Sequence, residues 1–378
     1  MYKIVHIFDD AIISKSTIEL FQKLRGYNQT FAVVVLPNEA DRVSQEITDA
    51  SIIQLKYNKN LTSQIKVLIE TNDIIICQAL SFEKSKAIIS KKYRNKVFIW
   101  GLWGYDLYNF VNYTQKNPDN VFETTSTKNK KLKQQFLDFY TYRIIYTKAI
   151  QKIDICLFFL ESDFHLLTSV INHKAAWHTS CYQTLDNLYG QSEPYEVTGN
   201  SILIGNSSTP SNRHKVIFES LQNINISDRK LVVPLSYGDL EYRKEIIEFG
   251  KNAYNSQFVP LLDYMSLNSY IDVLSKCSHV ILGHKRQQGF GTILMMLLAG
   301  SKIYLSNESP LFKWLKSKKC NVFSIENDLE NESFDNFDDV LKAENRQIIS
   351  SIIAEDVILE QLNQLLDKAI KIAETRKK

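Results

Sequence analysis

Uninterrupted apolar runs recur along this chain and alternate with longer segments in which apolar residues are spaced as on one face of a helix. In the N-terminal half these runs cover residues 3–8, 31–37, 73–80, 96–101, 154–159 and 175–181. The alternation starts again with runs at residues 201–205, 230–235, 257–262, 279–283, 302–306 and 320–325. Strands that are apolar on both faces are typical of parallel sheets covered by helices on both sides. The pattern therefore predicts an α/β fold with two doubly wound sheets.

A polar segment that contains glycine and proline interrupts the alternation at residues 182–200 and is typical of a linker. It separates a first domain at residues 1–185 from a second at residues 200–343. Helical spacing then continues to the end of the sequence, so we expect a C-terminal helix at residues 344–378. Two doubly wound domains joined by a linker form a cleft, and ligands of such sheets bind beyond the carboxyl ends of the strands. The residues that follow each strand are therefore the candidates for function.

The composition narrows the class of protein. A hydrophobic fraction of 44% with 23% charged residues is typical of a folded globular protein. The net charge of +3 is too small to indicate a nucleic-acid partner, and no apolar run is long enough to span a membrane. The sequence contains neither a CxxC pair nor an HExxH motif, and its five cysteines are scattered, so we expect reduced cysteines and no metal site. The sequence starts directly with a strand pattern, which predicts a cytoplasmic protein without a signal peptide.

The segment at residues 279–306 predicts a strand, a loop, a helix and a second strand. Gly289 and Gly291 allow the backbone of the loop to approach a ligand closely, and Thr292 is placed to cap the helix. Free amides at the helix start favour an anion, and Lys285 and Arg286 add positive charge. The loop predicts a phosphate or diphosphate site. The alternative is a tight turn whose charges are solvated.

Two further loops follow strands of the same predicted sheet. The loop after residues 201–205 is small and polar and enters a helix with Ser211 or Asn212 as its expected cap. The loop after residues 230–235 contains Ser236, Tyr237 and Gly238. Three such loops at one edge of a sheet indicate a joint site for a nucleotide or sugar. Ordinary turns, which also favour Ser, Asn and Gly, are the alternative.

In the first domain, the stretch WGLWGYDLY at residues 100–108 follows a buried strand. Aromatic side chains beside a carboxylate are typical of sugar sites, and Asp106 is placed to deprotonate a hydroxyl. The alternative is that the tryptophans pack in the core and Asp106 caps a helix. His6, at the end of the first strand, either faces the cleft or is a hydrogen-bonded core histidine.

A basic amphipathic segment occupies residues 128–153, with apolar residues at helical spacing, tyrosines at their boundary and one acidic residue, Asp138. Such a helix binds an anionic membrane surface. Alternatively it packs against the core and its basic face is solvated.

Four motifs occur here in an order and spacing that resembles a known family: WGYDLY, ILIGNSSTPSNRH, VVPLSYG followed by Tyr242, and RQQGFGT. They are similar to those of the bacterial 4-acetamido-4,6-dideoxygalactose (Fuc4NAc) transferases, over residues 97–310. The resemblance implies a GT-B glycosyltransferase with two Rossmann-like domains, the donor bound by the second and the acceptor by the first, without a metal or other cofactor. It implies a dTDP-sugar donor, a polyprenyl-diphosphate-linked saccharide as acceptor, and a peripheral location on the cytoplasmic face of the inner membrane. The segment at residues 109–129 is longer than the family pattern.

The resemblance also implies roles for individual residues. The donor would be bound by Gly205, Asn206, Ser207, Ser211, Asn212, Ser236, Tyr237, Gly238, Arg286, Gln287, Gln288, Gly289, Phe290, Gly291 and Thr292. Arg286 would neutralise the diphosphate leaving group, and Asp106 would be the base on the acceptor hydroxyl if the reaction inverts. The expected acceptor-binding residues are His6, Trp103, Tyr105 and Tyr108.

Two alternatives to this function remain open at the level of the sequence. The donor is a UDP- or GDP-sugar, or the two domains form a non-catalytic module that binds a nucleotide or sugar. A dinucleotide oxidoreductase is disfavoured, because the first strand leads into DDAIISKS without the glycine fingerprint.

Overall fold

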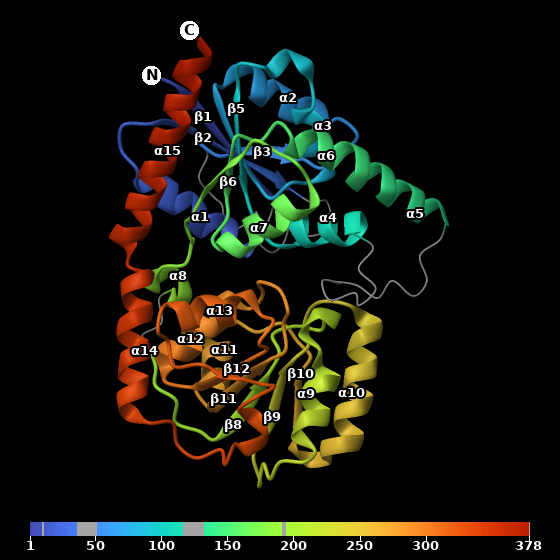
Figure 1. Cartoon of the computed structure of the whole chain (residues 1–378), viewed down its shortest axis with the longest axis vertical. Coiled ribbons are helices and arrows are strands. Elements are labelled where there is room, and N and C mark those ends of the chain that lie inside the picture. Colours follow the sequence, from blue (N-terminus) through green and yellow to red (C-terminus); the bar gives the residue numbers. More distant parts are fainter. Residues whose placement is uncertain (10, 36–50, 116–131, 191–193, 378) are drawn as a thin grey trace. The chain divides into compact units, whose positions relative to one another are not determined.

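The computed structural model describes residues 1–9, 11–35, 51–115, 132–190 and 194–377. Among these residues the chain forms two compact units. The first takes in the residues up to Tyr182 and again those from Glu355 onward, and the second runs from Gln183 to Ala354. Each unit is built on one parallel sheet with helices packed against it (Figure 1). The predicted α/β fold with two sheets is therefore confirmed.

In the described part of the first unit, seven parallel strands lie in the order β3-β2-β1-β4-β5-β6-β7. They are β1 (Lys3–Asp9), β2 (Asn28–Val35), β3 (Ile53–Lys56), β4 (Ile74–Gln78), β5 (Val97–Gly101), β6 (Ile155–Leu157) and β7 (Ala176–His178). The helices are α1 (Ile12–Lys23), α2 (Leu61–Thr71), α3 (Phe82–Ile88), α4 (Tyr105–Gln115), α5 (Leu132–Phe139), a π-helix (Tyr140–Tyr146), α6 (Thr147–Ile150), α7 (Glu161–Val170) and the C-terminal α15 (Glu355–Lys377). Strands β4 and β5 are buried along their whole length, which explains their continuous apolar sequence.

Strand β3 is the one that the hydrophobic pattern does not predict. It lies at the edge of the sheet and pairs with β2. Only Leu55 of its residues is buried. An edge strand with a single buried side chain has no apolar run to mark it in the sequence.

In the described part of the second unit, six parallel strands lie in the order β10-β9-β8-β11-β12-β13. They are β8 (Ser201–Ile204), β9 (Leu231–Pro234), β10 (Phe258–Leu261), β11 (Cys277–Leu282), β12 (Lys302–Leu305) and β13 (Phe323–Ser324). The helices are α8 (Leu185–Tyr189), α9 (His214–Leu221), α10 (Leu240–Tyr254), α11 (Leu267–Leu274), α12 (Phe290–Ala299), α13 (Pro310–Ser317) and α14 (Asp339–Ile352). Gly300 ends α12 in the left-handed conformation, as its sequence predicts.

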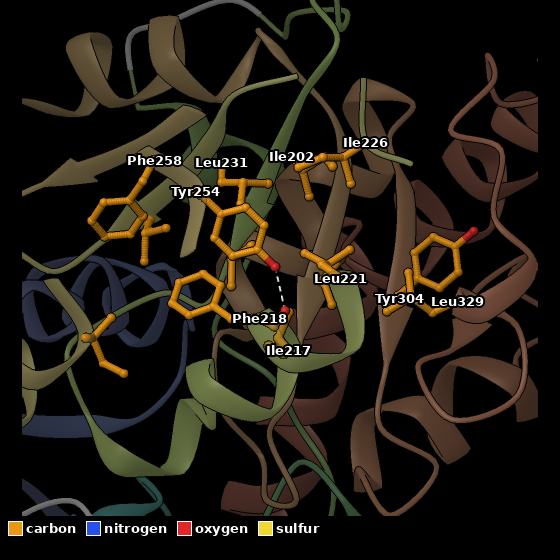
Figure 2. Packing of buried hydrophobic residues seen from close by; sticks show 14 of the residues in the cluster. Ile202, Ile217, Phe218, Leu221, Ile226, Leu231, Tyr254, Phe258, Tyr304 and Leu329 are labelled. Atoms are coloured by element: carbon orange, nitrogen blue, oxygen red, sulfur yellow. Dashed lines mark hydrogen bonds between the residues drawn. The ribbon is translucent and has the colours of Figure 1, made fainter. Parts of the chain in front are cut away.

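The core of the second unit forms where helices α9 and α10 pack on the sheet (Figure 2). Ile202, Leu231 and Phe258 come from three neighbouring strands and meet Phe218 of α9. The hydroxyl of Tyr254 on α10 donates a hydrogen bond to the backbone oxygen of Phe218, so its polar end is satisfied within the apolar cluster. This packing holds the strand ends, and the loops that follow them, in place.

The single C-terminal helix expected at residues 344–378 is wrong. The structure divides this segment into α14, which belongs to the second unit, and α15, which belongs to the first. Ile353 closes α14 and is fully buried, and Glu355 and Asp356 provide the acidic first turn of α15. Helical spacing continues across this break, so the pattern alone does not reveal it.

Helix α15 completes the first unit although 172 residues of the second unit (183 to 354) precede it in the chain. Its buried face packs near α1, β4 and β5. Near its end, Arg376 donates to the carboxylate of Asp154 with Nη1 at 2.9 Å from Oδ2. The hydroxyl of Tyr27 donates to Asp367 at 2.8 Å. The C-terminal segment is therefore part of the first unit.

Candidate functional site

The three polar loops that the sequence singled out all lie at the carboxyl edge of the second sheet. They follow β8, β9 and β11. Strands β8 and β11 are neighbours in the sheet, although β9 follows β8 along the chain. The loops after β8 and β11 therefore flank the point at which the strand order reverses, which is where ligands of open α/β sheets bind.

Asn212 organises the loop that follows β8. Its side-chain nitrogen donates to the backbone oxygen of Ser207 at 2.8 Å, to the Ser207 hydroxyl at 3.0 Å and to the Thr209 hydroxyl at 2.9 Å. Its Oδ1 accepts the backbone N–H of Asn206 at 2.9 Å and lies 2.8 Å from Nε2 of His284 in the loop after β11. The side chain is fully buried. Asn212 thus shapes its own loop and joins it to the next.

Gln288 makes a second connection between the same two loops. Its Oε1 accepts the hydroxyl of Ser211 at 2.7 Å and the Nε–H of Arg286 at 2.8 Å. Its amide nitrogen donates to Oδ1 of Asn206 at 3.0 Å and to the hydroxyl of Thr209 at 3.1 Å. These bonds orient Arg286 within the loop. They also join several of the residues expected to bind the sugar donor into one polar network. Thr209, which the sequence did not single out, is part of it.

The expected helix caps are wrong in both loops. Ser211 and Asn212 lie in a short 3₁₀-helix, and the residue at the N-cap of α9 is Arg213, which adopts the left-handed conformation without a side-chain cap. The N-cap of α12 is Gly289, also left-handed, rather than Thr292. Ser211 and Asn212, which would have capped α9, are instead bonded across the loops to Gln288 and His284.

Gly205 is required by close packing where β8 ends. Its φ of +70° lies in the left-handed region. A Cβ at this position would lie 2.4 Å from Nε2 of His214 and 2.9 Å from Oδ1 of Asn212. Glycine therefore lets the strand end against two buried polar side chains.

The loop after β9 joins the network through Tyr237. Its backbone oxygen accepts the N–H of Ser208 at 2.8 Å and the Ser208 hydroxyl at 2.7 Å, and its phenol accepts the side-chain nitrogen of Asn206 at 3.4 Å. Gly238 allows the close approach of Ser208, because a Cβ there would lie 2.8 Å from its backbone. The ring of Tyr237 is 55% exposed, and Ser236 beside it is half-buried. An exposed ring beside a polar network is suited to stacking on a base or a sugar.

The positive charge of this network comes from arginine and not from histidine. Burial lowers the pKa of His214 to about 3, and burial together with the charge of Arg286 lowers the pKa of His284 to about 3, so both imidazoles are neutral. Lys285 forms an ion pair with Glu308. Arg286, with 8% of its surface exposed, is the buried cation of the loop.

Helix α12 begins directly after this cation. It starts at Phe290, and the helix dipole favours negative charge at this end. Phe290 packs edge-on against Trp314, with ring centroids 5.9 Å apart, and so anchors the start of the helix. Gln287 and Gly291 are half-buried. An arginine close to the start of a helix suits a phosphate or diphosphate.

In the first unit the structure places Asp106 in the interior. It is 1% exposed and lies in the first turn of α4. Its carboxylate accepts the indole N–H of Trp100 at 2.6 Å, the backbone N–H of Leu80 at 3.0 Å and that of Trp103 at 3.3 Å. Burial raises the pKa of Asp106, although these three donors oppose the rise. The geometry favours a structural role, which fixes the loop after β5, over the role of base.

Two of the expected acceptor-binding residues are also core residues. His6 is fully buried, with Nε2 at 2.9 Å from Oε1 of Gln29, and its ring lies 4.3 Å from that of Phe21. Burial lowers its pKa to about 3. Tyr108 is 1% exposed and donates to Asp163 at 2.7 Å. Both are hydrogen-bonded within the unit, which is the alternative that the sequence left open for His6.

The other two expected residues reach the surface. Tyr105 is 38% exposed, and its hydroxyl donates to Oδ2 of Asp9 at 2.8 Å. Trp103 is half-buried, and its indole N–H finds no acceptor among the described residues. These two side chains remain candidates for the acceptor. Asp9, the last residue of β1, accepts this bond from Tyr105 and is not among the site residues that the sequence predicts.

The basic segment at residues 128–153 is described from residue 132 onward, and residues 116–131, which include most of the longer segment at 109–129, lie outside the described part. Helix α5 exposes Phe136, Leu137 and Phe139, with 74%, 52% and 55% of their surfaces accessible. Asp138 faces the interior and accepts the hydroxyl of Tyr113 at 2.5 Å. Phe136, Leu137 and Phe139 therefore face outward, whereas the core-packing alternative places them inside.

No helix in the described part of the chain is long and apolar enough to cross a membrane. Within the same residues, no group of three or more His, Cys, Asp or Glu side chains is placed to hold a metal ion. All five cysteines are buried, and none of them forms a disulfide.

The fold is that of GT-B glycosyltransferases. HepE from Anabaena, solved in complex with UDP and glucose, superimposes with a TM-score of 0.68 at 9% identity, over 97% of this chain and 100% of that one. A glycosyltransferase from Rickettsia africae matches with a TM-score of 0.59 at 13% identity, over 98% of this chain and 99% of that one. An α-glucosyltransferase in complex with UDP-glucose and DNA matches with a TM-score of 0.58 at 10% identity, over 98% and 99% of the two chains.

The sequence itself identifies the family. Residues 128–369 match the family described as 4-α-L-fucosyltransferase, glycosyl transferase group 56. The match covers more than half of the chain, so the protein belongs to this glycosyltransferase family. The resemblance to Fuc4NAc transferases that the motifs indicate is thus confirmed.

Proposed function

We propose that the protein transfers a deoxyamino sugar of the Fuc4NAc type from a dTDP-sugar to a polyprenyl-diphosphate-linked saccharide, as a step in the synthesis of bacterial surface polysaccharide. Membership of a fucosyltransferase family supports a deoxy sugar as the transferred group. The observation that carries the proposal is the polar network in which Gln288 orients Arg286 beside the first amides of α12.

In the proposed reaction, a hydroxyl of the acceptor attacks C1 of the donor sugar. The bond between C1 and the diphosphate oxygen breaks, the nucleoside diphosphate leaves, and the hydroxyl proton goes to a base. Arg286 and the amides at the start of α12 would stabilise the charge that develops on the diphosphate, because they are oriented before the reaction begins. The loops after β8 and β9 would bind the nucleoside and the sugar.

A UDP-sugar is the second candidate donor. The Anabaena protein was solved with UDP and with UDP-glucose, and its fold is similar to that of this chain. The nucleobase of the donor is recognised by a few contacts within the site, so proteins of the same fold bind different nucleotides. Direct competition between nucleotides separates the two candidates.

The proposed acceptor is anchored in a lipid bilayer, and helix α5 offers a surface that suits it. The exposed side chains Phe136, Leu137 and Phe139 lie on the same segment as the exposed cations Arg143 and Lys148. Apolar side chains next to basic ones bind membranes with anionic lipids. The protein would then be a peripheral protein on the cytoplasmic face of the inner membrane.

Titration calorimetry with dTDP, UDP, GDP and CMP, in buffer with a metal chelator, tests the donor site. We expect dTDP to bind most tightly, and Arg286→Ala to weaken it roughly 10- to 100-fold, as for the loss of hydrogen bonds between charged groups. Lys244→Ala is the matched control, because Lys244 is 74% exposed on α10 of the same unit and pairs with Glu241. Preference for UDP would favour the second candidate. No binding of any nucleotide would refute the proposal.

A further inference from the structure

The first sheet also has a point at which its strand order reverses, at the carboxyl ends of β1 and β4. These strands are neighbours in the sheet although β2 follows β1 along the chain. Asp9 is the last residue of β1, and Lys84 lies in the helix that follows β4. Nζ of Lys84 lies 2.8 Å from Oδ1 of Asp9, so this ion pair joins the two segments at the reversal point.

Lys84 is a fully buried lysine, which is uncommon in a folded protein. Besides Asp9, its ammonium group contacts the backbone oxygen of Gln78 at 2.6 Å and that of Ala79 at 3.3 Å. Three oxygen atoms thus surround the buried cation, as its burial requires. A carboxylate that pairs with such an immobile cation is itself fixed in position.

Asp9 combines this fixed position with access to solvent. Its side chain is 26% exposed, whereas Asp106 is 1% exposed. Its second oxygen, Oδ2, accepts the hydroxyl of Tyr105 at 2.8 Å. A carboxylate has about four lone-pair sites, so one bond to each oxygen leaves capacity for a ligand. Of the two, Asp9 is therefore the carboxylate that a substrate hydroxyl can reach.

We propose that Asp9 is the catalytic base of this enzyme. Its carboxylate binds the acceptor hydroxyl and takes its proton while the hydroxyl oxygen bonds to C1 of the donor sugar and the nucleoside diphosphate departs with the electrons of the C1–O bond. Lys84 and Tyr105 are positioning residues that orient the carboxylate. This inference rests on the proposed glycosyl transfer. It assigns the role of base to Asp9 instead of Asp106.

A purely structural ion pair between Asp9 and Lys84 is the competing explanation, because buried pairs also occur without function. The two explanations differ in what Asp9→Asn changes. A base is needed for turnover and not for nucleotide binding, whereas a structural pair affects folding and, through it, every activity.

The test compares the wild type and Asp9→Asn in nucleoside diphosphate release from dTDP- and UDP-deoxyamino sugars with farnesyl-diphosphate-linked disaccharides as acceptors. We expect Asp9→Asn to lower kcat roughly 10²- to 10⁴-fold, the range for loss of a general base, with the Kd for dTDP within twofold of the wild type. The matched control is Glu70→Gln. Glu70 also pairs with a lysine, Lys92, and accepts a tyrosine hydroxyl, Tyr93, at 3.1 Å, but on the surface of α2. It should retain wild-type kcat.

Rescue of nucleotide release by sodium azide is a second measurement, and a purely structural role of Asp9 would not produce this rescue. Azide attacks C1 without losing a proton, so it does not need a base. We expect azide to raise nucleotide release by Asp9→Asn at least roughly tenfold and to yield the glycosyl azide, with no such gain in the wild type. The double variant Asp9→Asn/Lys84→Met removes both charges, and serves if the single variant does not fold.

The outcomes separate this inference from the proposed function. Normal turnover by Asp9→Asn, or loss of nucleotide binding together with activity and without azide rescue, would overturn the role of Asp9 and leave glycosyl transfer intact. A wild-type protein that releases no nucleotide from any of these donors would overturn both.

Discussion

The imidazole of His284 lies with Nε2 at 2.8 Å from Oδ1 of Asn212 and so connects the loop after β11 to the loop after β8. The two residues are 72 positions apart in the chain. Because the pKa of His284 is lowered to about 3, this contact is made by a neutral imidazole and adds no charge next to Arg286. In the polar network of these loops, Asn212 and His284 hold the two loops together, and Arg286 provides the positive charge.

Asn212→Ala should weaken nucleotide binding without removing the cation. The change breaks the bonds to Ser207, Thr209 and His284 and leaves buried polar groups without their partner, which costs about 1–3 kcal/mol each. We expect at least a tenfold rise in the Kd for dTDP by calorimetry. Asn223→Ala is the control, because Asn223 is exposed beyond the end of α9 in the same unit and outside the network. Unchanged affinity in Asn212→Ala would show that the loop binds no nucleotide.

Gly205→Ala should destabilise the second unit more than a left-handed backbone alone explains. The left-handed conformation costs an alanine roughly 1–2 kcal/mol, and the new Cβ would in addition displace His214. Gly190→Ala is the comparison, because Gly190 also has a positive φ of +59° but its Cβ would meet an atom only at 3.4 Å. Urea unfolding measures both. Equal losses of stability would show that the contact with His214 is relaxed at no cost.

Stability should fall as the pH is lowered from 7 to 5. Burial lowers the pKa of His6, His214 and His284 from 6.5 to about 3, so below pH 6.5 the unfolded chain binds protons that the folded chain does not. Each such histidine contributes a loss of up to about 1.4 kcal/mol per pH unit between these two pKa values. Thermal unfolding at several pH values should show a shallower dependence in His6→Gln than in the wild type. His165→Gln, on the surface of α7 with its side chain 70% exposed, should leave the slope unchanged.

Removal of α15 should unfold the first unit while the second remains folded. The helix contributes buried residues at Ile358, Leu362, Leu365, Leu366, Ala369 and Ala373, and each large aliphatic side chain is worth about 1.5–3 kcal/mol. A chain that ends at Ala354 should lose one of two calorimetric transitions. Arg376→Ala in the full chain should lower the temperature of the transition of the first unit without abolishing it. Asp154 retains an ion-pair partner in Lys174, whose Nζ lies 2.7 Å from Oδ1. Two unchanged transitions after truncation would contradict the assignment of α15 to the first unit.

The double variant Phe136→Ser/Phe139→Ser should reduce binding to vesicles that contain anionic lipids. The two side chains are 74% and 55% exposed, and loss of even part of their burial in a bilayer corresponds to roughly a tenfold loss of affinity. Cosedimentation with phosphatidylglycerol vesicles measures this effect. Val67→Ser, on α2 of the same unit and 59% exposed, is the matched control. Equal binding by all three proteins would exclude α5 as a membrane-binding surface.

The hydrophobic pattern was sufficient for the fold because a strand buried on both faces must be largely apolar, and β4 and β5 are buried along their whole length. The hydrophobic pattern fails where a structural feature leaves no mark on the spacing of apolar residues. Edge strand β3 buries one side chain, and the break between α14 and α15 does not disturb helical spacing. The donor loops were predicted because parallel strands place their carboxyl ends at one edge, whatever the details of the turns.

The first unit shows what sequence alone did not determine. Asp9 and Asp106 both follow buried strands, and nothing in their local sequence tells which one is enclosed. The tertiary structure decides, because the indole of Trp100 and the amide of Leu80 close over Asp106, while Lys84 holds Asp9 at the surface. Burial and ion pairing depend on residues far apart in the chain. The sequence by itself therefore determined the family, the sheets and the place of the polar loops, and only the packing of distant segments decided which carboxylate is open to solvent.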